Sequence, residues 1–379
     1  MNVFRRAILT CLVTALIGGV LILSPVGSAL DQRLGLSWVF KLRGPVPAPS
    51  DVLVVSVGEA SAVQLDQPTR LRDWDHSLHA DLVRRLSDRG AAAIVFDVFF
   101  NSSTANNSDL EFAREIEQSK RVVLVQHVAR DQHDQFTIDR LINPIPGLSS
   151  AAIGLAPFPL PKIGNRFGHF WAFYSGVKES PTLPVVALQV HVLGLHGYDN
   201  FLALLRNAGF QSAVEVPTSI SGWSDLQVLM KSLRTTLRAN PRISEKLREQ
   251  QGDSIEARTL LALVDTYTGE DSYYLNFYGP PGAIRTVKYS DFWGDSETQR
   301  KNGLLDLSYK TVFIGAAVQS SNTKGDGFFT VFSRNDGVDI GGVEIAATAF
   351  ANILENRTLH TLSRIENLGI VLIFGILIA

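Results

Sequence analysis

The sequence predicts an α/β fold: a mainly parallel sheet with flanking helices, one N-terminal transmembrane helix, a helical insertion in the middle and the start of a second transmembrane helix at the C-terminus. Two observations predict the sheet. Strand-like and helix-like segments alternate between residues 51 and 128, as in parallel sheets whose crossovers are helices. The strand-like segments DVLVVSVGE and AAAIVFDVFF are almost continuously apolar, which is typical of strands buried on both faces.

The N-terminal segment 1–30 predicts a membrane anchor. Arg5 and Arg6 precede a run without charge from Ala7 to Leu30, and a bilayer requires roughly 20 apolar residues in a helix. Because Lys and Arg stay on the cytoplasmic side, residue 31 and those after it are expected outside. Gly27-Ser28-Ala29 also resembles a signal-peptidase site, but the apolar run is longer than that of a signal peptide, which favours an uncleaved anchor.

The next segments alternate regularly. Residues 31–49 predict a short juxtamembrane helix and a proline-rich connector, and strands are expected at 51–58, 91–99 and 121–128. The helix after the first strand shows an apolar stripe and then a C-terminal Gly90; the stripe consists of Leu78, Leu82, Val83 and Leu86. The helix after the second strand is expected to begin with a capping box.

That capping box would pair Ser108 with Glu111, three residues later. Residues 144–161 are rich in proline and glycine and predict a loop. Residues 181–196 predict a helix that Thr182 opens, with Pro184 in its first turn. From about 198 to 268 the chain is charged and helical without strand signals, so we expect a helical insertion in the same domain.

The last part returns to alternating elements. SYYLNFYG predicts a strand, GPPG a turn and residues 311–316 a buried strand. A polar loop is expected between Val318 and Ile340. The following helix should end near Asn356, and its apolar stripe consists of Val343, Ala346, Ala347, Phe350 and Ile353. Residues 366–379 lack a polar face and predict the truncated start of a second membrane helix.

Composition excludes several classes of function. The net charge of −2 gives no basic face for nucleic acid, and the single cysteine, Cys11, allows no disulfide within the domain. The sequence contains no phosphate-binding loop, no dinucleotide fingerprint, no zinc-protease or serine-hydrolase motif. We therefore expect no catalytic residues, no metal site and no cofactor in these residues.

A few polar residues fall where ligands tend to bind, at the carboxyl ends of parallel strands. Glu59, Asp97 and Asp326 are the candidate ligand-binding residues, and His127 and the rest of 318–326 lie nearby in the predicted topology. Two carboxylates favour a cation or a small molecule with hydroxyl or amine groups. A structural role, as a loop cap or a buried hydrogen-bonding group, is the alternative for each. His79 is expected to be a packed or surface histidine, and Glu344 to complement its helix dipole.

Five segments, in order, resemble one known family. They are DVLVVSVGE, HADLVRRLSDRGAAAIVFDVFF, LNFYGPPGAIRTVKYSDFW, YKTVFIGAA and GVEIAATAFANIL. Together they resemble the second type of CHASE domain, the cyclase- and histidine-kinase-associated sensory extracellular family, over most of residues 31–360. This sequence departs from the family at GHFWAFYSGVKE, which lacks the acids of the family's aspartate-rich stretch, and at RDWDHSLHA, which replaces a tryptophan-proline step.

The resemblance implies a sensory input domain over residues 31–365, on the periplasmic side of a bacterial inner membrane. It would relay a small-molecule or envelope stimulus to a cytoplasmic cyclase, kinase or diguanylate cyclase outside this chain. The expected partners are the membrane and a second copy, joined as a homodimer through the membrane helices. The alternative is a membrane-tethered periplasmic enzyme or a structural envelope protein.

Overall fold

The computed structural model describes most of the chain, namely residues 13–14, 16–20, 24, 36–104, 107–132, 137–161, 168–212, 215–316, 327–328, 330–332, 340–359 and 364–378. The chain divides into two compact units. One comprises Met1–Pro45 with Leu359–Ala379, and the other Val46–Thr358. The larger unit contains the sheet.

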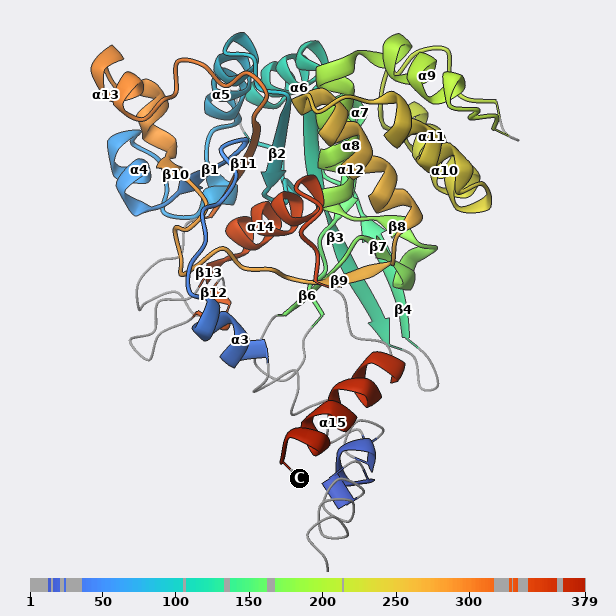
Figure 1. Ribbon diagram of the computed structural model, residues 1–379. Helices are drawn as coiled ribbons and strands as arrows, with labels where there is room; N and C mark the ends of the chain where they lie inside the picture. Colours follow the sequence, from blue (N-terminus) through green and yellow to red (C-terminus); the bar gives the residue numbers. More distant parts are fainter. Residues whose placement is uncertain are drawn as a thin grey trace, which may run out of the picture. The chain divides into compact units, whose positions relative to one another are not determined.

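The larger unit is built on a seven-stranded sheet in the order β10-β1-β11-β2-β3-β4, with β5 also paired to β3 (Figure 1). All neighbouring strands are parallel except β4, which is antiparallel to β3. The strands are β1 (Val52–Val57), β2 (Ala93–Asp97), β3 (Val122–Gln132), β4 (Thr137–Ile142), β5 (Gly154–Pro157), β10 (Thr286–Lys288) and β11 (Thr311–Ala316). The mainly parallel sheet and its four predicted strands are confirmed.

Helices cover both faces of the sheet, so the unit has three layers. α5 (His76–Asp88) and α6 (Ser108–Ser119) enclose a buried cluster with one face of β1, β2, β3 and β11. α14 (Gly342–Leu354) packs on β1 and β11, and α8 (Leu183–His196) packs on β2, β3 and β5. Side chains alternate between the faces along each strand, so both faces of these apolar strands are buried.

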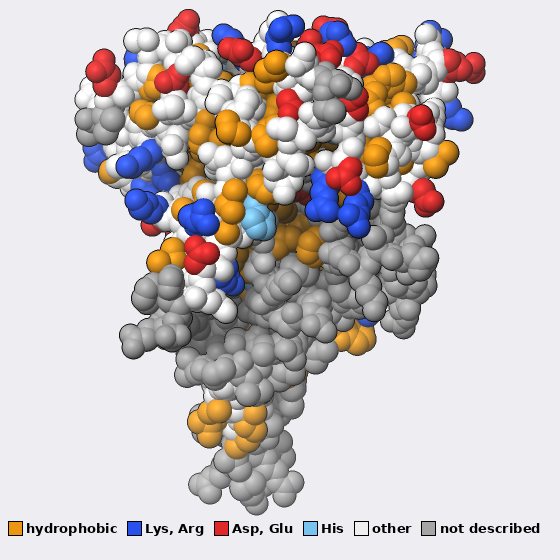
Figure 2. All heavy atoms as spheres, turned by 180° about the vertical axis from the view of Figure 1, so that it is seen from behind, with side chains coloured by type: hydrophobic (Ala, Val, Ile, Leu, Met, Phe, Trp, Pro, Cys, Tyr) orange, Lys and Arg blue, Asp and Glu red, His pale blue; other side chains and the backbone are white. Residues whose placement is uncertain are grey.

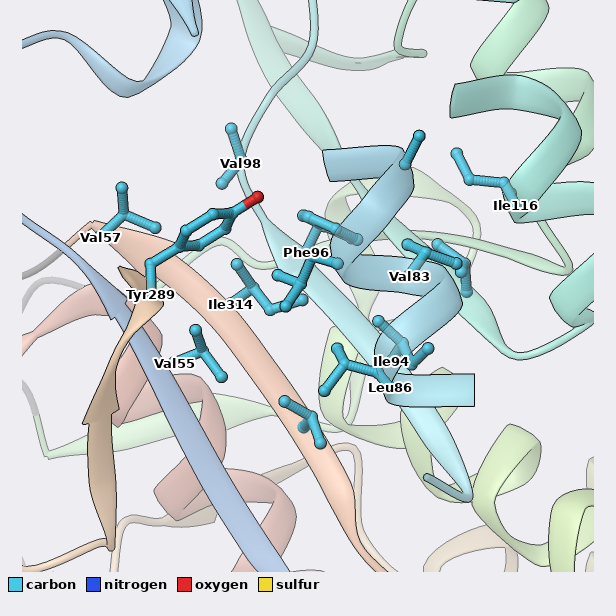
Figure 3. Packing of buried hydrophobic residues seen from close by; sticks show 14 of the residues in the cluster. Val55, Val57, Val83, Leu86, Ile94, Phe96, Val98, Ile116, Tyr289 and Ile314 are labelled. Atoms are coloured by element: carbon cyan, nitrogen blue, oxygen red, sulfur yellow. The ribbon is translucent and has the colours of Figure 1, made fainter. Parts of the chain in front are cut away.

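The α5–α6 side shows this alternation directly (Figure 3). Val55 and Val57 of β1, Ile94 and Phe96 of β2 and Ile314 of β11 lie in one cluster with Val83 and Leu86 of α5 and Ile116 of α6. All are buried. The predicted apolar stripe on the first helix therefore faces the sheet, as its spacing of three and four residues requires.

The helical insertion is confirmed and belongs to the same unit. Its helices are α9 (Tyr198–Asn207), α10 (Trp223–Ala239), α11 (Arg242–Gln250) and α12 (Ile255–Thr268). α12 packs on both α8 and α14. These two helices are therefore covered by the sheet on one side and by α12 on the other, which explains why they are apolar almost all round.

Two local predictions were wrong, and a third is confirmed over only part of its length. The capping box does not form: Asn107, at a positive φ of 60°, precedes the helix, and the Ser108 hydroxyl hydrogen-bonds with Thr104 Oγ1 at 2.7 Å. The predicted loop 144–161 contains α7 (Pro146–Ala151) and β5, because β3 offers a free edge to the short apolar segment. SYYLNFYG forms only β9 (Ser272–Tyr274), which pairs with β6 (His169–Trp171) outside the main sheet.

The remaining elements are short: α4 (Glu59–Gln64), η2 (Leu71–Asp73), β7 (Phe173–Tyr174), η3 (Ser175–Val177), β8 (Ser180–Pro181), η4 (Tyr289–Trp293), α13 (Ser296–Lys301), β12 (Gly327–Phe328) and β13 (Ile340–Gly341). The loop predicted between Val318 and Ile340 lies largely outside the described residues. Two described pieces pair with each other: β12, in the middle of this range, and β13, at its end.

The smaller unit contains α3 (Leu36–Arg43), which is the predicted juxtamembrane helix, and α15 (Arg364–Ile378). The predicted anchor 1–30 lies mostly outside the described residues, but its pieces 13–14 and 16–20 are helical. A Cβ added at Gly18 would lie 2.5 Å from Val371 Cγ1, so the backbone at Gly18 closely approaches α15. Within the described ranges, no helix combines the length and hydropathy needed to cross a bilayer.

Candidate functional site

Asp97, the central candidate from the sequence, ends β2 and is half-buried. Cβ atoms added at Gly315 and Gly342 would lie 3.4 Å from Asp97 Cβ and Asp97 Oδ2, respectively. Asp97 therefore lies directly beside the N-terminus of α14, where the helix dipole favours a carboxylate. This placement agrees with the expectation that the helix at Gly342 begins at the same rim.

The other two candidates do not join Asp97 in the described structure. Glu59 is the exposed first residue of α4, after β1. Because β11 lies between β1 and β2, the ends of these strands are two strand spacings apart, about 10 Å. Asp326 lies outside the described residues. The structure thus places Glu59 and Asp97 on one edge of the sheet but not side by side.

Two pockets open at the same edge beyond Asp97, and both are lined by Phe99 and His127. Their rings lie 5.4 Å apart between centroids. One pocket has a volume of about 670 Å³ and the other about 470 Å³. We call them together the Phe99–His127 site. Its other lining residues are Asn101, Ile142, Asn143, Pro144, Ile145 and Pro146 in the first pocket, and Val125, Gln126, Val128, Arg130, Phe158, Pro159, Leu160 and Tyr174 in the second.

The site follows from the unequal lengths of two strands. β2 ends at Asp97, whereas β3 continues to Gln132 and pairs with β4 from His127 onward. The extension leaves His127 exposed beside the segment that follows β2. The backbone N–H of Ile145 donates to the carbonyl of Phe100 at 2.9 Å, which holds the residues after β4 against the residues after β2.

Gln126 connects the two pockets. Its Nε2 donates to Asn143 Oδ1 at 2.7 Å. Its Oε1 is buried and has no hydrogen-bond partner within the part of the chain that the structure describes. An unpaired buried amide oxygen is unfavourable, and a donor group brought by a ligand would relieve that cost.

The charges at the site compensate one another. Arg130 donates two hydrogen bonds to Asp139, from Nε at 2.8 Å and from Nη2 at 3.2 Å, and the Tyr174 hydroxyl donates to the same carboxylate. The hydrogen bonds from Arg130 and Tyr174 lower the pKa of Asp139, so it stays ionised and paired. Among the described lining residues there are aromatic, amide and imidazole groups, and the one Arg or Lys side chain, Arg130, is paired with Asp139.

Figure 2 shows the molecule from the α5–α6 side. On that face a histidine borders a hollow among hydrophobic side chains, and Lys and Arg side chains gather on either side.

Sequence reasoning identified His127 near this edge but missed Phe99, Gln126 and Asn143. The sequence could have indicated Phe99. It lies two residues after Asp97 in AAAIVFDVFF, and side chains two residues apart in an extended segment point to the same face. Gln126 and Asn143 carried no such signal. Their positions depend on where β4 folds back, which the polar sequence of that hairpin does not specify.

Two other groups of polar residues are structural. His79 is fully buried, as the packed alternative predicted, and its Nδ1 lies 3.0 Å from the Tyr289 hydroxyl. Glu344 lies in the first turn of α14, where it was expected to complement the helix dipole, and it is also buried. Its Oε1 accepts hydrogen bonds from the backbone N–H groups of Gly282 at 2.8 Å and Ile284 at 3.4 Å. Burial raises the pKa of Glu344, and these backbone donors oppose the rise.

A third pocket, of about 380 Å³, lies where α11, α12 and the end of α14 meet. Most of its charged side chains are paired, for example Arg248 with Asp265, and Asp265 also accepts from Asn356 at 2.9 Å. Within the described ranges no three His, Cys, Asp or Glu residues gather as metal ligands would. The Phe99–His127 site is therefore the better candidate for recognition.

Comparison with known proteins gives one match. The family model for the CHASE2 domain matches residues 9–379. No curated protein and no solved structure matches the chain significantly. CHASE2 domains are extracellular sensory domains of signalling receptors, and they are not catalytic. The matched range covers almost the whole sequence, so this chain belongs to the CHASE2 domain family.

Proposed function

We propose that the chain is the periplasmic input unit of a bacterial transmembrane receptor, anchored in the inner membrane by residues 1–30 and by the helix that begins near residue 366. The observation that carries the proposal is the apolar surface of both segments. Val13, Leu16, Ile17 and Val20 are exposed, and so are many side chains of α15: Ile365, Ile370, Leu372, Ile373, Phe374, Ile376 and Leu377. Such surfaces are stable in lipid and unfavourable in water.

The output is a cyclase, kinase or diguanylate cyclase module on the cytoplasmic side, and two copies of the receptor associate through their membrane helices. The close approach of Gly18 and Val371 supports a coupling role for the helix pair. Small residues allow membrane helices to pack tightly, so a shift of one helix moves the other. A stimulus acts only if it binds the two states of the receptor with different affinity.

Reporter fusions test the topology. Alkaline phosphatase fused after residue 45 should be active, because it requires the periplasm, and a cytoplasm-only reporter at the same position should be silent. The reverse pattern would overturn the proposed orientation. A substitution of Arg5 and Arg6 by Glu provides a matched control, since it removes the charges that orient the anchor.

We propose further that the stimulus binds at the Phe99–His127 site, next to Asp97. The aromatic rings and prolines favour a ligand with a flat apolar face, and the amides of Asn101, Gln126 and Asn143 favour hydroxyl or carbonyl groups on it. An uncharged ring-bearing molecule fits better than a free cation, because Asp139 is already paired with Arg130. The cation expected from Glu59 and Asp97 stays a separate prediction.

The ligand class is testable with the full chain in lipid nanodiscs. A panel of neutral sugars, aromatic compounds and organic cations is screened by thermal shift. Neutral ring-bearing compounds should raise the melting temperature, and His127→Ala should abolish that rise. Stabilisation by organic cations that is lost in Asp97→Ala but kept in His127→Ala would favour the carboxylate rim instead.

A further inference from the structure

α3 presents an apolar surface that no other described segment covers. Trp38 is 63% exposed, Val39 60% and Leu42 81%. Trp38 and Leu42 are four residues apart and Val39 and Leu42 three apart, so all three lie on one side of the helix. We call them the α3 apolar face. Phe40, on the other side, is buried.

Two cations flank this face. Lys41 follows Trp38 by three residues and Arg43 follows Val39 by four, so each lies next to one edge of the α3 apolar face. The Arg43 guanidinium also stacks on the Phe40 ring, with 4.7 Å from Cζ to the ring centroid. The sequence of α3, LSWVFKLR, contains no Asp or Glu. The positive charges of Lys41 and Arg43 are therefore not neutralised by a carboxylate of the same helix.

The position of α3 in the chain limits what can cover it. The charge-free run ends at Leu30, six residues before α3 begins at Leu36. Six residues span at most about 20 Å, so α3 stays near the membrane surface if the run crosses the bilayer. The helix ends at Arg43, and the following Gly44, with a φ of +71°, turns the chain into the proline-rich connector.

We propose that the α3 apolar face lies in the headgroup region of the outer surface of the inner membrane, with Lys41 and Arg43 on anionic phospholipid phosphates. Tryptophan favours this region because its ring is apolar and its N–H is polar. An amphipathic helix with cations beside its apolar face is the arrangement that binds at an anionic interface. This inference rests on the proposed membrane anchoring of the chain.

The test uses the full chain reconstituted in vesicles of phosphatidylethanolamine and phosphatidylglycerol. Fluorescence of Trp38 is obtained as the difference between the wild type and Trp38→Phe, which keeps the other four tryptophans. Lipids brominated close to the headgroup should remove most of the Trp38 fluorescence, and aqueous iodide should have little effect. Lys41→Gln with Arg43→Gln should weaken lipid quenching in these vesicles. The same double variant should behave like the wild type in vesicles of neutral lipid only.

Two readouts separate failure of the inference from failure of the proposed function. Flotation of the chain with the vesicles reports anchoring by residues 7–30. A chain that does not float contradicts the anchoring and the inference with it. A chain that floats while iodide quenches Trp38 contradicts the inference alone. Protection of Trp38 from both quenchers would show that protein, such as a second copy, covers the α3 apolar face, which also overturns the inference.

Discussion

Two aromatic–histidine clusters lie near the end of β2, and they differ in access to water. In one cluster, His79 packs against Phe96 and Phe100 at ring distances of 5.8 and 5.4 Å. In the other cluster, Phe99 lies 5.4 Å from His127. His79 is fully buried and His127 is exposed.

The comparison teaches that residue type does not decide the role of these histidines. The buried cluster is closed by Trp74, Phe112 and Tyr289, and its imidazole contributes through packing and one hydrogen bond. The half-buried Phe99 and the exposed His127 line two pockets. Substitutions in the first cluster should change stability, and substitutions in the second should change recognition.

The largest effect is expected for Phe96→Ala. The ring is fully buried among Phe100, Phe112 and His79, so its removal leaves a cavity and should lower the free energy of unfolding by about 3–5 kcal/mol. Urea unfolding of Phe96→Ala and of Phe99→Ala, the matched rim variant, measures the contrast. An equal loss of unfolding free energy in the two variants would contradict the proposed difference between the buried cluster and the Phe99–His127 site.

The next effect is pH dependence. Burial and the nearby His76 lower the pKa of His79 from 6.5 to about 3. The unfolded chain therefore takes up a proton below about pH 6.5 and the folded chain does not until about pH 3, so the free energy of unfolding is full above pH 6.5 and falls as the pH falls. One such group should lower the free energy of unfolding by about 2 kcal/mol as the pH falls from 7 to 5.

Urea unfolding at several pH values measures this slope. His79→Gln should reduce the slope by up to one proton. Burial also lowers the pKa of His76 and His191, so part of the slope should remain in His79→Gln. If the free energy of unfolding depended on pH equally in His79→Gln and the wild type, the burial of His79 away from water would be contradicted.

An effect of similar size is expected at the border of the buried cluster. Asp109 Oδ1 lies 2.6 Å from His76 Nδ1 and accepts from the backbone N–H and the hydroxyl of Thr104. Asp109→Ala leaves these groups without their acceptor and should cost about 1–3 kcal/mol. Asp73→Ala, which removes an exposed ion pair with Arg72, is the control and should cost less than about 1 kcal/mol.

The smallest change in stability is expected for His127→Ala. His127 is exposed, and among the described aromatic rings its imidazole contacts that of Phe99. Thermal unfolding should place the variant within about 0.5 kcal/mol of the wild type. A loss as large as that of Asp109→Ala would mean that the Phe99–His127 pair holds the β3 extension in place rather than serving recognition.

The sequence predicted the buried half of this comparison better than the exposed half. The segments VLVVSV and AIVFD are apolar at nearly every position, which is typical of inner strands that are buried on both faces. The spacing of Leu82 and Leu86 matches the period of a helix. The exposed site depends on β5 and β4 pairing with successive stretches of β3, residues 123–126 and 127–132. The sequence that decides their register is polar or short, and therefore weakly specified.

The candidate carboxylates show the same limit. The carboxyl end of β2 was predicted correctly, but the insertion of β11 between β1 and β2 separates Glu59 from Asp97. Strand order depends on a pairing that spans more than 200 residues of chain, from Val52 to Thr311. No local pattern reports such a pairing, so the composition of the rim could not be predicted.

The most direct test of the account is the signalling output of the full-length receptor carrying Phe99→Ala, His127→Ala or the matched control His196→Ala. His196 lies at the end of α8, where its Nε2 is 3.0 Å from the carbonyl of Glu256, and it lines neither pocket. The account predicts an altered output for both site variants, with melting temperatures near that of the wild type, and a normal output for His196→Ala. Normal signalling by both site variants would contradict it.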